Sequence, residues 1–330
     1  MLHEVDFQSY NQRDRVYGWV WVPAANPHGI VQLIHGFGEH ARRYLHMIST
    51  LVDAGYIVCA DDHVGHGKTA VENDTWGDWG SRGWETMTED EHTLTGIVKE
   101  LYPNLPYFLF GHSMGSFIAK DYISKYGGEL DGVILCGTSG HFPHAEEVQA
   151  ELFEAISEGR GEESDPQYGQ ELMGWMNERV KNVKLGNEWI CDDVYVQLDH
   201  AGDPFNAFSK PTTNRALYYF TKLITETCSR EWAERVPESM PIYIISGDED
   251  PVGRYGDGVR EIRDLLEESG HAVNMVLYPG YRHEIHNYSD LKDEVEDGIL
   301  TYLDLVVLGD QVEDVLDEDD DIDLQDPESF

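Results

Sequence analysis

The sequence G-H-S-M-G at residues 111–115 constrains the fold of this chain more than any other segment. It follows the apolar run Tyr107–Phe110, which predicts a buried strand, and it precedes Phe117–Ile123, where apolar residues recur at helical spacing. A strand that turns directly into a helix with a serine at the turn is a nucleophile elbow. The two glycines let the helix pack closely on the strand, so the Ser113 hydroxyl stands clear of the turn.

Strand and helix patterns alternate on both sides of this turn. Short apolar runs predict strands, and longer stretches with apolar residues at helical spacing predict helices. The predicted strands are Val16–Val22, Gly29–Ile34, Tyr56–Ala60, Tyr107–Phe110, Gly132–Cys136, Pro241–Ser246 and Val273–Tyr278, and the predicted helices are Tyr44–Ala54, Glu89–Leu101, Ser113–Tyr126, Val259–Ser269 and Leu291–Val307. This order is typical of βαβ winding, so we expect an α/β fold with a mostly parallel, doubly wound sheet.

The alternation stops between His141 and Val236, where aromatic and charged residues, turn clusters and helical patterns replace the strand signals. We interpret residues 141–236 as an inserted helical cap, and residues 1–140 and 237–308 as the α/β core. Residues 309–330 contain eleven Asp or Glu and no Lys or Arg. We expect this acidic tail to be disordered or loosely docked, because a block of like charges cannot bury enough apolar surface to offset its ordering entropy.

The composition and net charge of the chain limit the kinds of partner that we expect. With 330 residues, 41% of them hydrophobic, the chain can bury a large core. The net charge of −40 would be repelled by nucleic acid and by anionic membranes, so we expect neither as an electrostatic partner. The four cysteines have no C-x-x-C spacing and are interpreted as free thiols. Neither a signal-peptide pattern nor an apolar stretch of membrane-spanning length occurs, so we expect no stable membrane insertion and a cytoplasmic location.

A serine hydroxyl is a weak nucleophile near neutral pH, so it needs an imidazole to take its proton and a carboxylate to orient that imidazole. One late strand ends in a loop that contains Asp248, Glu249 and Asp250, and the next strand ends in a loop that leads to His283. The carboxyl ends of parallel strands meet at one edge of a sheet, and the order serine, acid, histidine is the one expected for this architecture. The pattern leaves the choice among the three acids open.

Two histidines compete for the role of the base. His283 lies on the loop at the strand end, whereas His286 follows three residues later on nearly the same face if a helix begins there. Reach toward Ser113 is easiest from the strand end. We therefore favour His283.

Negative charge develops on the substrate carbonyl oxygen during attack, and backbone N–H groups that point at it stabilise the transition state. One such donor is the amide of Met114, the residue after the serine. The other is expected on a loop after an early strand, and the glycine-rich residues 35–40 follow the predicted strand Gly29–Ile34. We predict that Phe37 N–H is the second donor.

The segment Asp61–Gly67 contains two histidines and two acids, which are residues that metal ions bind. Companion ligands with matching spacing are not evident elsewhere in the sequence, so we predict that this segment shapes a loop and holds no metal. Walker-type and dinucleotide-binding fingerprints do not occur either. The sequence therefore predicts neither a cofactor nor a metal.

Five motifs give the chain a resemblance to a known family. They are H-G-F-G-E-H at residues 35–40, D-H-V-G-H-G at 62–67, G-H-S-M-G at 111–115, G-D-E-D-P-V at 247–252 and G-Y-R-H-E at 280–284. With these motifs the chain resembles the α/β-hydrolases of the monoacylglycerol lipase and lysophospholipase group, which is classed with the serine aminopeptidase domain. The resemblance covers about residues 18–140 and 241–303 well, and the cap only loosely.

Carried over by position, the resemblance implies that Ser113 is the nucleophile, Asp250 the acid and His283 the base, with Phe37 and Met114 supplying the oxyanion hole. It also implies an α/β-hydrolase fold with a helical cap. One departure is Ser116, where the family often has a further glycine. This departure concerns helix packing and not the chemistry.

We therefore expect a cofactor-independent serine carboxylic ester hydrolase that acts on a small-molecule ester or lipid through an acyl-enzyme. The aromatic residues of the cap either line an apolar acyl tunnel or pack the cap core, and they include Trp175, Trp189, Phe205, Phe208, Tyr218, Tyr219 and Phe220. A serine aminopeptidase is the alternative, and it would need a cap acid to bind a free amine. A non-catalytic binding protein on a hydrolase fold is the third candidate, but such proteins usually lack a member of the triad.

Overall fold

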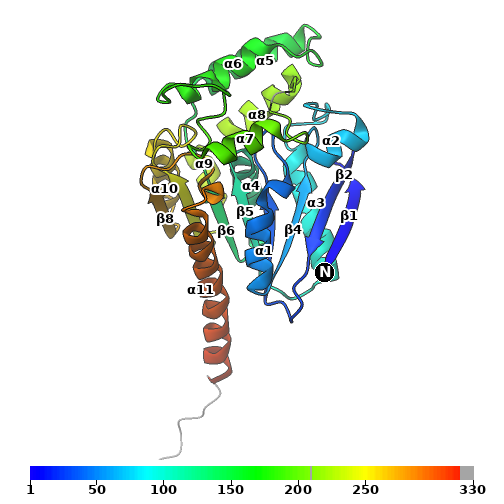
Figure 1. Cartoon of the computed structure of the whole chain (residues 1–330). Helices are drawn as coiled ribbons and strands as arrows, with labels where there is room; N and C mark the ends of the chain where they lie inside the picture. The colour runs from blue at the N-terminus through cyan, green and yellow to red at the C-terminus, as the bar shows by residue number, and fades with distance from the viewer. Residues whose placement is uncertain (209, 320–330) are drawn as a thin grey trace, which may run out of the picture.

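The computed structural model describes residues 1–208 and 210–319, and its centre is one eight-stranded sheet with helices on both faces (Figure 1). The strand order is β1-β2-β4-β3-β5-β6-β7-β8. The strands are β1 (Leu2–Gln8), β2 (Arg15–Trp21), β3 (Gly29–Ile34), β4 (Tyr56–Asp62), β5 (Tyr107–His112), β6 (Gly132–Cys136), β7 (Ile242–Gly247) and β8 (Val273–Tyr278). Strands β3 to β8 are parallel, whereas β2 is antiparallel to both β1 and β4. The predicted α/β class and the mostly parallel sheet are confirmed.

Helices cover both faces of this sheet. They are α1 (Leu45–Asp53), α2 (Gly67–Asn73), α3 (Thr86–Leu101), α4 (Met114–Tyr126), α5 (Ala145–Ser157), α6 (Pro166–Met173), α7 (Val194–Gly202), α8 (Asn214–Glu226), α9 (Arg230–Ala233), α10 (Asp257–Glu268) and α11 (Lys292–Asp319). In Figure 1, α1 and α11 lie on the near face of the sheet, and α3 and α4 lie behind it. The helices thereby bury the sheet on both sides, which explains why every residue of β3, β4, β5, β6 and β7 is buried.

The sequence patterns did not predict β1. Only Phe7 of its seven residues is buried, because β1 is an edge strand that pairs with β2 alone. Runs of apolar residues identify central strands, because these are buried on both faces. A mostly exposed edge strand has no such run and is therefore missed.

The last helix is longer than the sequence pattern predicts. The prediction ended it at Val307, but α11 continues to Asp319. No proline occurs between Lys292 and Asp319 to stop the helix. The remainder of the acidic tail, residues 320–330, lies outside the described residues.

The insertion between β6 and β7 is helical. It contains α5, α6, α7, α8 and α9, and no strand occurs in its described parts, residues 141–208 and 210–236. Figure 1 shows α5 to α8 above the upper edge of the sheet. This is the edge at which the parallel strands have their carboxyl ends, so the insertion lies over the region where α/β proteins place their ligands.

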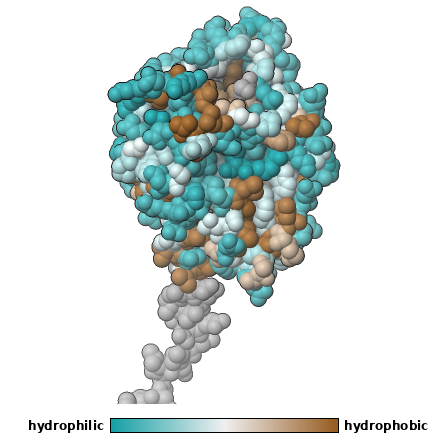
Figure 2. Space-filling model, in the orientation of Figure 1, coloured by the Kyte–Doolittle hydropathy of each residue, from teal (hydrophilic) through white to brown (hydrophobic). Residues whose placement is uncertain are grey.

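The surface in Figure 2 is predominantly hydrophilic, with scattered hydrophobic residues. This agrees with the large excess of acidic residues in the sequence. Within residues 1–208 and 210–319, no helix has both the length and the apolar character needed to cross a bilayer.

Candidate active site

Ser113 occupies a sharp turn between β5 and α4. Its φ of 55° lies in the left-handed region that non-glycine residues rarely adopt, and its amide donates to the carbonyl of Cys136 at 3.0 Å. Side chains on the flanking glycines would collide with backbone, since a Cβ at Gly111 would lie 2.4 Å from the Gly115 carbonyl oxygen. A Cβ at Gly115 would lie 2.0 Å from the carbonyl oxygen of Ile34 in β3. The strained turn that the sequence predicts is therefore present.

The loop after β8 brings His283 to the loop after β7, where Asp250 lies. His283 Nδ1 is 2.9 Å from Asp250 Oδ2, and both side chains are buried. Asp250 also accepts hydrogen bonds from the Ser246 hydroxyl and from the Val252 amide. Because three donors hold this carboxylate, it is fixed in one orientation and in turn fixes the imidazole.

The electrostatics of His283 follow from this pairing. Burial lowers the pKa of His283, and the Asp250 carboxylate raises it, with a net shift above the ordinary value. His283 Nε2 is buried and has no hydrogen-bond partner within residues 1–208 and 210–319. This nitrogen is therefore available to a group that enters the site.

The other candidates for acid and base are placed differently. Asp248 is half-buried and accepts the amide of Gly280, while Glu249 is exposed. His286 is fully buried and stacks on Tyr44, with ring centroids 4.9 Å apart. Burial holds the pKa of His286 well below its ordinary value. Of the five candidates, the structure pairs only Asp250 with His283.

Ser113 and His283 lie on the same edge of the sheet and share neighbours. The ring of His112, which precedes Ser113, is 4.7 Å from the ring of His283 between centroids. Gly137 follows Cys136, whose carbonyl accepts the Ser113 amide. A Cβ at Gly137 would lie 2.9 Å from His283 Cε1. The two residues thus lie at the same edge of the sheet, but His283 Nε2 forms no hydrogen bond with the Ser113 hydroxyl. In unliganded enzymes such pairs are often longer than a hydrogen bond, and they close when substrate binds.

The loop of residues 35–40 lies directly beside the serine. A Cβ at Gly36 would be 3.0 Å from Ser113 Cβ, and the Gly36 amide donates to Glu39 Oε1 at 2.6 Å. Neither the Phe37 amide nor the Met114 amide hydrogen-bonds to any residue of the described chain. Both predicted oxyanion donors are therefore unoccupied and belong to segments that flank Ser113.

A buried network behind this loop was not predicted. Glu39 Oε1 also accepts the Tyr44 hydroxyl at 2.6 Å and lies 3.1 Å from His112 Nδ1, while Arg43 lies 3.3 Å from Glu39 Oε2. Burial raises the pKa of Glu39, but His112 and Arg43 together lower it by more, so the pKa lies well below its ordinary value. The ionised carboxylate therefore holds the loop and the strand end together. The signal in the sequence was the glutamate of the H-G-F-G-E-H motif.

Comparison with known proteins now identifies the group to which this arrangement belongs. A family model described as serine aminopeptidase, S33, matches residues 25–290, which is most of the chain. The chain belongs to this family. It is accordingly an α/β-hydrolase and an enzyme.

Several members of the wider group are similar over nearly the whole chain. A monoacylglycerol lipase of Mycolicibacterium smegmatis is 28% identical over 292 residues, which cover 86% of this chain and 92% of that protein. A thermostable carboxyl esterase from Bacillus coagulans, solved in complex with glycerol, is 53% identical with a TM-score of 0.92, covering 93% of this chain and 99% of that one. A lipase solved in an open form is 35% identical with a TM-score of 0.88, at the same coverages.

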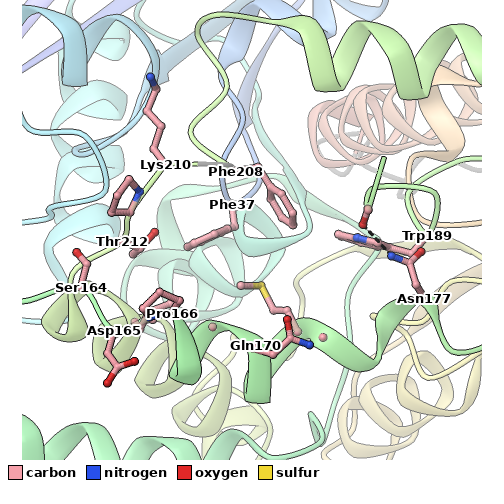
Figure 3. Close-up of a pocket in the computed structure, with 16 residues that line it drawn as sticks. Phe37, Ser164, Asp165, Pro166, Gln170, Asn177, Trp189, Phe208, Lys210 and Thr212 are labelled. Atoms are coloured by element: carbon pink, nitrogen blue, oxygen red, sulfur yellow. Dashed lines mark hydrogen bonds between the residues drawn. The ribbon is translucent and has the colours of Figure 1, made fainter. Parts of the chain in front are cut away.

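The hydrolase has a cavity between the cap and the core with a volume of about 570 Å³. Its lining consists of Phe37, Ser164, Asp165, Pro166, Gly169, Gln170, Met173, Gly174, Asn177, Gly186, Trp189, Phe208, Lys210, Pro211, Thr212 and Leu217. In Figure 3, Phe37 and Phe208 lie between Trp189 on one side and Thr212 and Ser164 on the other. The Trp189 ring, which lines the cavity, is 5.1 Å from the His283 ring, but neither Ser113 nor His283 is among the lining residues.

Most of the aromatic cap residues that the sequence suggested for a tunnel pack elsewhere. Of the seven, only Trp189 and Phe208 line this cavity. Tyr219 and Phe220 are buried in the hydrophobic core, and Trp175 packs against the core. Residues such as Met173 and Leu217, which no aromatic pattern marks, line the cavity in their place.

Proposed function

We propose that this α/β-hydrolase is a carboxylic ester hydrolase with Ser113 as nucleophile, His283 as general base and Asp250 as the acid that orients it. The main support for the proposal is the buried hydrogen bond between His283 and Asp250. This pair lies at the same edge of the sheet as the strained turn at Ser113. This arrangement fits the roles that acyl transfer by a serine requires.

In the proposed reaction, Ser113 Oγ attacks the acyl carbon of the ester while its proton passes to His283 Nε2. The amides of Phe37 and Met114 donate to the oxyanion that forms. The tetrahedral intermediate collapses, the alcohol leaves with the proton from His283, and an acyl-enzyme remains. Water then gives a proton to His283 and attacks the acyl-enzyme, and the acid is released as His283 returns the proton to Ser113 Oγ.

We propose a lipid-like ester, such as a monoacylglycerol, as the substrate class. The names of the Mycolicibacterium and Bacillus relatives support an ester substrate and, for the former, a monoacylglycerol. The cavity supports an apolar acyl chain, because aromatic and aliphatic side chains form much of its lining. We also propose residues 141–236 as the cap unit that selects this chain.

The aminopeptidase alternative receives less support from the cap. It would need a carboxylate aimed at a free amine, and among the described lining residues the only carboxylate is Asp165. That side chain already accepts the Gln167 amide as the N-cap of α6. A peptidase would therefore have to bind its amine with a group that is already engaged.

Labelling with a fluorophosphonate probe tests the assignment of the nucleophile. We expect the wild-type chain to be labelled and Ser113→Ala to remain unlabelled, because the probe forms a bond only with an activated serine. Ser116→Ala serves as the matched control, since the Ser116 hydroxyl donates to the Ser113 carbonyl inside α4 and does not face the site. Labelling of Ser113→Ala would overturn the proposal.

A chain-length series of nitrophenyl esters tests the proposed substrate class. We expect long acyl esters to be hydrolysed well, and Met173→Trp to lower kcat/KM for the longest ester about tenfold or more while sparing the acetyl ester, because the added bulk fills the cavity. Leu198→Trp, at an exposed site on α7, is the control. A wild-type preference for acetyl over all longer chains, or faster turnover of amino-acid arylamides, would contradict the ester-lipid assignment.

A further inference from the structure

Three buried side chains outside the proposed catalytic residues converge on one point. Asp61 comes from the end of β4, His63 from the turn that follows it, and Glu91 from α3. Each side chain is at most 1% exposed. His63 Nδ1 lies 3.0 Å from Asp61 Oδ1 and 3.3 Å from Glu91 Oε1. A nitrogen and two carboxylate oxygens therefore face one another in the interior of the protein.

The hydrogen bonds around His63 show which of its nitrogens carries a lone pair. Nε2 lies 3.2 Å from the carbonyl oxygen of His35 and must donate to it, because a carbonyl oxygen can only accept. A neutral imidazole with its proton on Nε2 has a lone pair on Nδ1. Nδ1 lies within 3.3 Å of one oxygen of each carboxylate, so three acceptor atoms meet.

No donor within residues 1–208 and 210–319 hydrogen-bonds to these atoms. Asp61 Oδ1 and Oδ2, Glu91 Oε1 and His63 Nδ1 are all buried without a hydrogen-bond partner. The second oxygen of Glu91, by contrast, accepts the Gln32 side-chain amide, which fixes the carboxylate in place. Buried unpaired acceptors are costly, so such a cluster calls for a positive group at its centre.

We propose that Asp61, His63 and Glu91 bind a divalent transition-metal ion of the Zn²⁺ type. In a tetrahedral site with bonds of about 2.0–2.1 Å, ligand atoms lie about 3.3 Å apart, close to the separations measured here. One imidazole and two carboxylates are a donor set that Zn²⁺ accepts. The His35 carbonyl accepts from His63 Nε2 and the Gln32 side-chain amide donates to Glu91 Oε2, and such partners orient the ligands of a metal ion.

The sequence predicted no metal at residues 61–67 because no companion ligand with a matching spacing was evident. The companion ligand exists, but it is Glu91 on α3, whose distance along the chain gives no recognisable spacing. The ion would also support the predicted oxyanion loop, because His63 binds both the carbonyl and the side chain of His35, where that loop begins.

A proton is the competing occupant. Without a cation, a proton between the Glu91 and Asp61 carboxyl groups would relieve their mutual repulsion. The two occupants differ in a measurable way. A bound ion gives a stoichiometric metal content and a stability that depends on metal, whereas a proton gives neither.

The test begins with the full chain unfolded in guanidinium with a chelator, then refolded with or without Zn²⁺. After gel filtration, we expect about one Zn²⁺ per chain by mass spectrometry of the metal and a higher Tm in the zinc-refolded sample. We expect Glu91→Gln to lose most of the bound zinc, and Asp90→Asn to keep it. Asp90 is the matched control because it is a buried carboxyl on the same helix that binds Ser9 and Tyr10 instead.

Two further measurements test the zinc site without the Glu91→Gln variant, in case that variant does not fold. Refolding the wild-type chain with Co²⁺ should give the intense visible absorption of a four-coordinate ion. Cys136→Ser tests the other buried cluster of ligand type, formed by His112, Cys136 and His286, and it should leave the zinc content unchanged. Little zinc in the wild type with an unchanged Tm, a weak six-coordinate Co²⁺ spectrum, or loss of zinc in Cys136→Ser would each overturn the proposal.

Discussion

Asp250 differs from the two acids beside it in its surroundings and not in its chemistry. It is fully buried and receives hydrogen bonds from a hydroxyl, an amide and an imidazole. Asp248 and Glu249, two and one residues earlier, lie partly or largely in solvent. A carboxylate orients an imidazole only when it is itself held in place, so the surroundings decide which acid serves.

Replacing Asp250 by Asn should therefore separate its role from that of Asp248. We expect Asp250→Asn to lower kcat for ester hydrolysis by about 10⁴-fold, because the amide favours the wrong tautomer of His283. Asp248→Asn should stay within a few-fold of wild type. Steady-state kinetics with a nitrophenyl ester, alongside circular dichroism to verify folding, give the comparison. Equal losses in both variants would contradict the assignment of the acid.

The pH dependence of activity should report on the same pair. A general base must be neutral, and Asp250 raises the pKa of His283 against the opposing effect of burial. We expect kcat/KM to rise with pH through a midpoint above about 6.5, the ordinary value for histidine. A midpoint well below that value would refute the pairing.

The same shift contributes to stability with a defined sign. The folded-state pKa of His283 is raised, so its contribution is fully present below about pH 6.5, where the imidazolium pairs with Asp250. It is lost as the pH rises through the folded-state value. Asp250→Asn should remove this contribution, which chemical unfolding at two pH values would measure.

At the scale of elements, the site depends on how closely α4 packs on the sheet. Gly115 in the first turn of α4 touches the carbonyl groups of Ile34 and His35, so β3 and α4 meet backbone to backbone. This contact places the start of the loop of residues 35–40 beside Ser113. The serine at position 116, where the family often has glycine, is accommodated because its hydroxyl donates to the Ser113 carbonyl at 2.6 Å.

A pair of helix glycines tests this packing. We expect Gly115→Ala to destabilise the fold by about 1–3 kcal/mol and to impair ester hydrolysis, because its Cβ would push α4 away from β3. Gly96→Ala, on the exposed side of α3 with nothing within 4 Å, should stabilise the fold by up to about 1 kcal/mol. Urea unfolding of both variants provides the measurement, and an unchanged stability in Gly115→Ala would contradict the backbone contact.

At the scale of the whole molecule, charge is the dominant feature. The chain carries 63 acidic residues against 23 basic ones, so like charges repel across most of its surface. Many ion pairs are solvent-exposed and contribute little each. The repulsion is therefore not cancelled by local pairing.

Salt should accordingly stabilise this protein. We expect Tm to rise between about 10 mM and 1 M NaCl, because the screening length falls from about 30 Å to about 3 Å and repulsion weakens. Sucrose at equal osmolality controls for effects on hydration, and scanning calorimetry gives the Tm. A Tm that falls with added NaCl would show that attractive pairs outweigh the repulsion.

How much the sequence could predict depended on whether the signal was local. The central strands and most helices followed from apolar runs and helical spacing, since burial on both faces of a sheet leaves a mark within a few residues. The edge strand β1 has no apolar run or alternation, because only one of its seven residues is buried. The end of the last helix was likewise placed too early, at Val307, because apolar residues at helical spacing become sparse beyond it whereas α11 continues to Asp319.

The candidate site divides in the same way. The sequence by itself determined the strained Ser113 turn, the glycine loop at residues 35–40 and the order of serine, acid and histidine, because each depends on neighbouring residues. The residue pattern left the acid open and the family resemblance implied Asp250, and the tertiary structure shows Asp250 in contact with His283. Only the tertiary structure decided that Glu91 joins Asp61 and His63, and which side chains line the cavity. These contacts join residues far apart in the chain, and burial, which sets their electrostatics, exists only once the whole chain has packed.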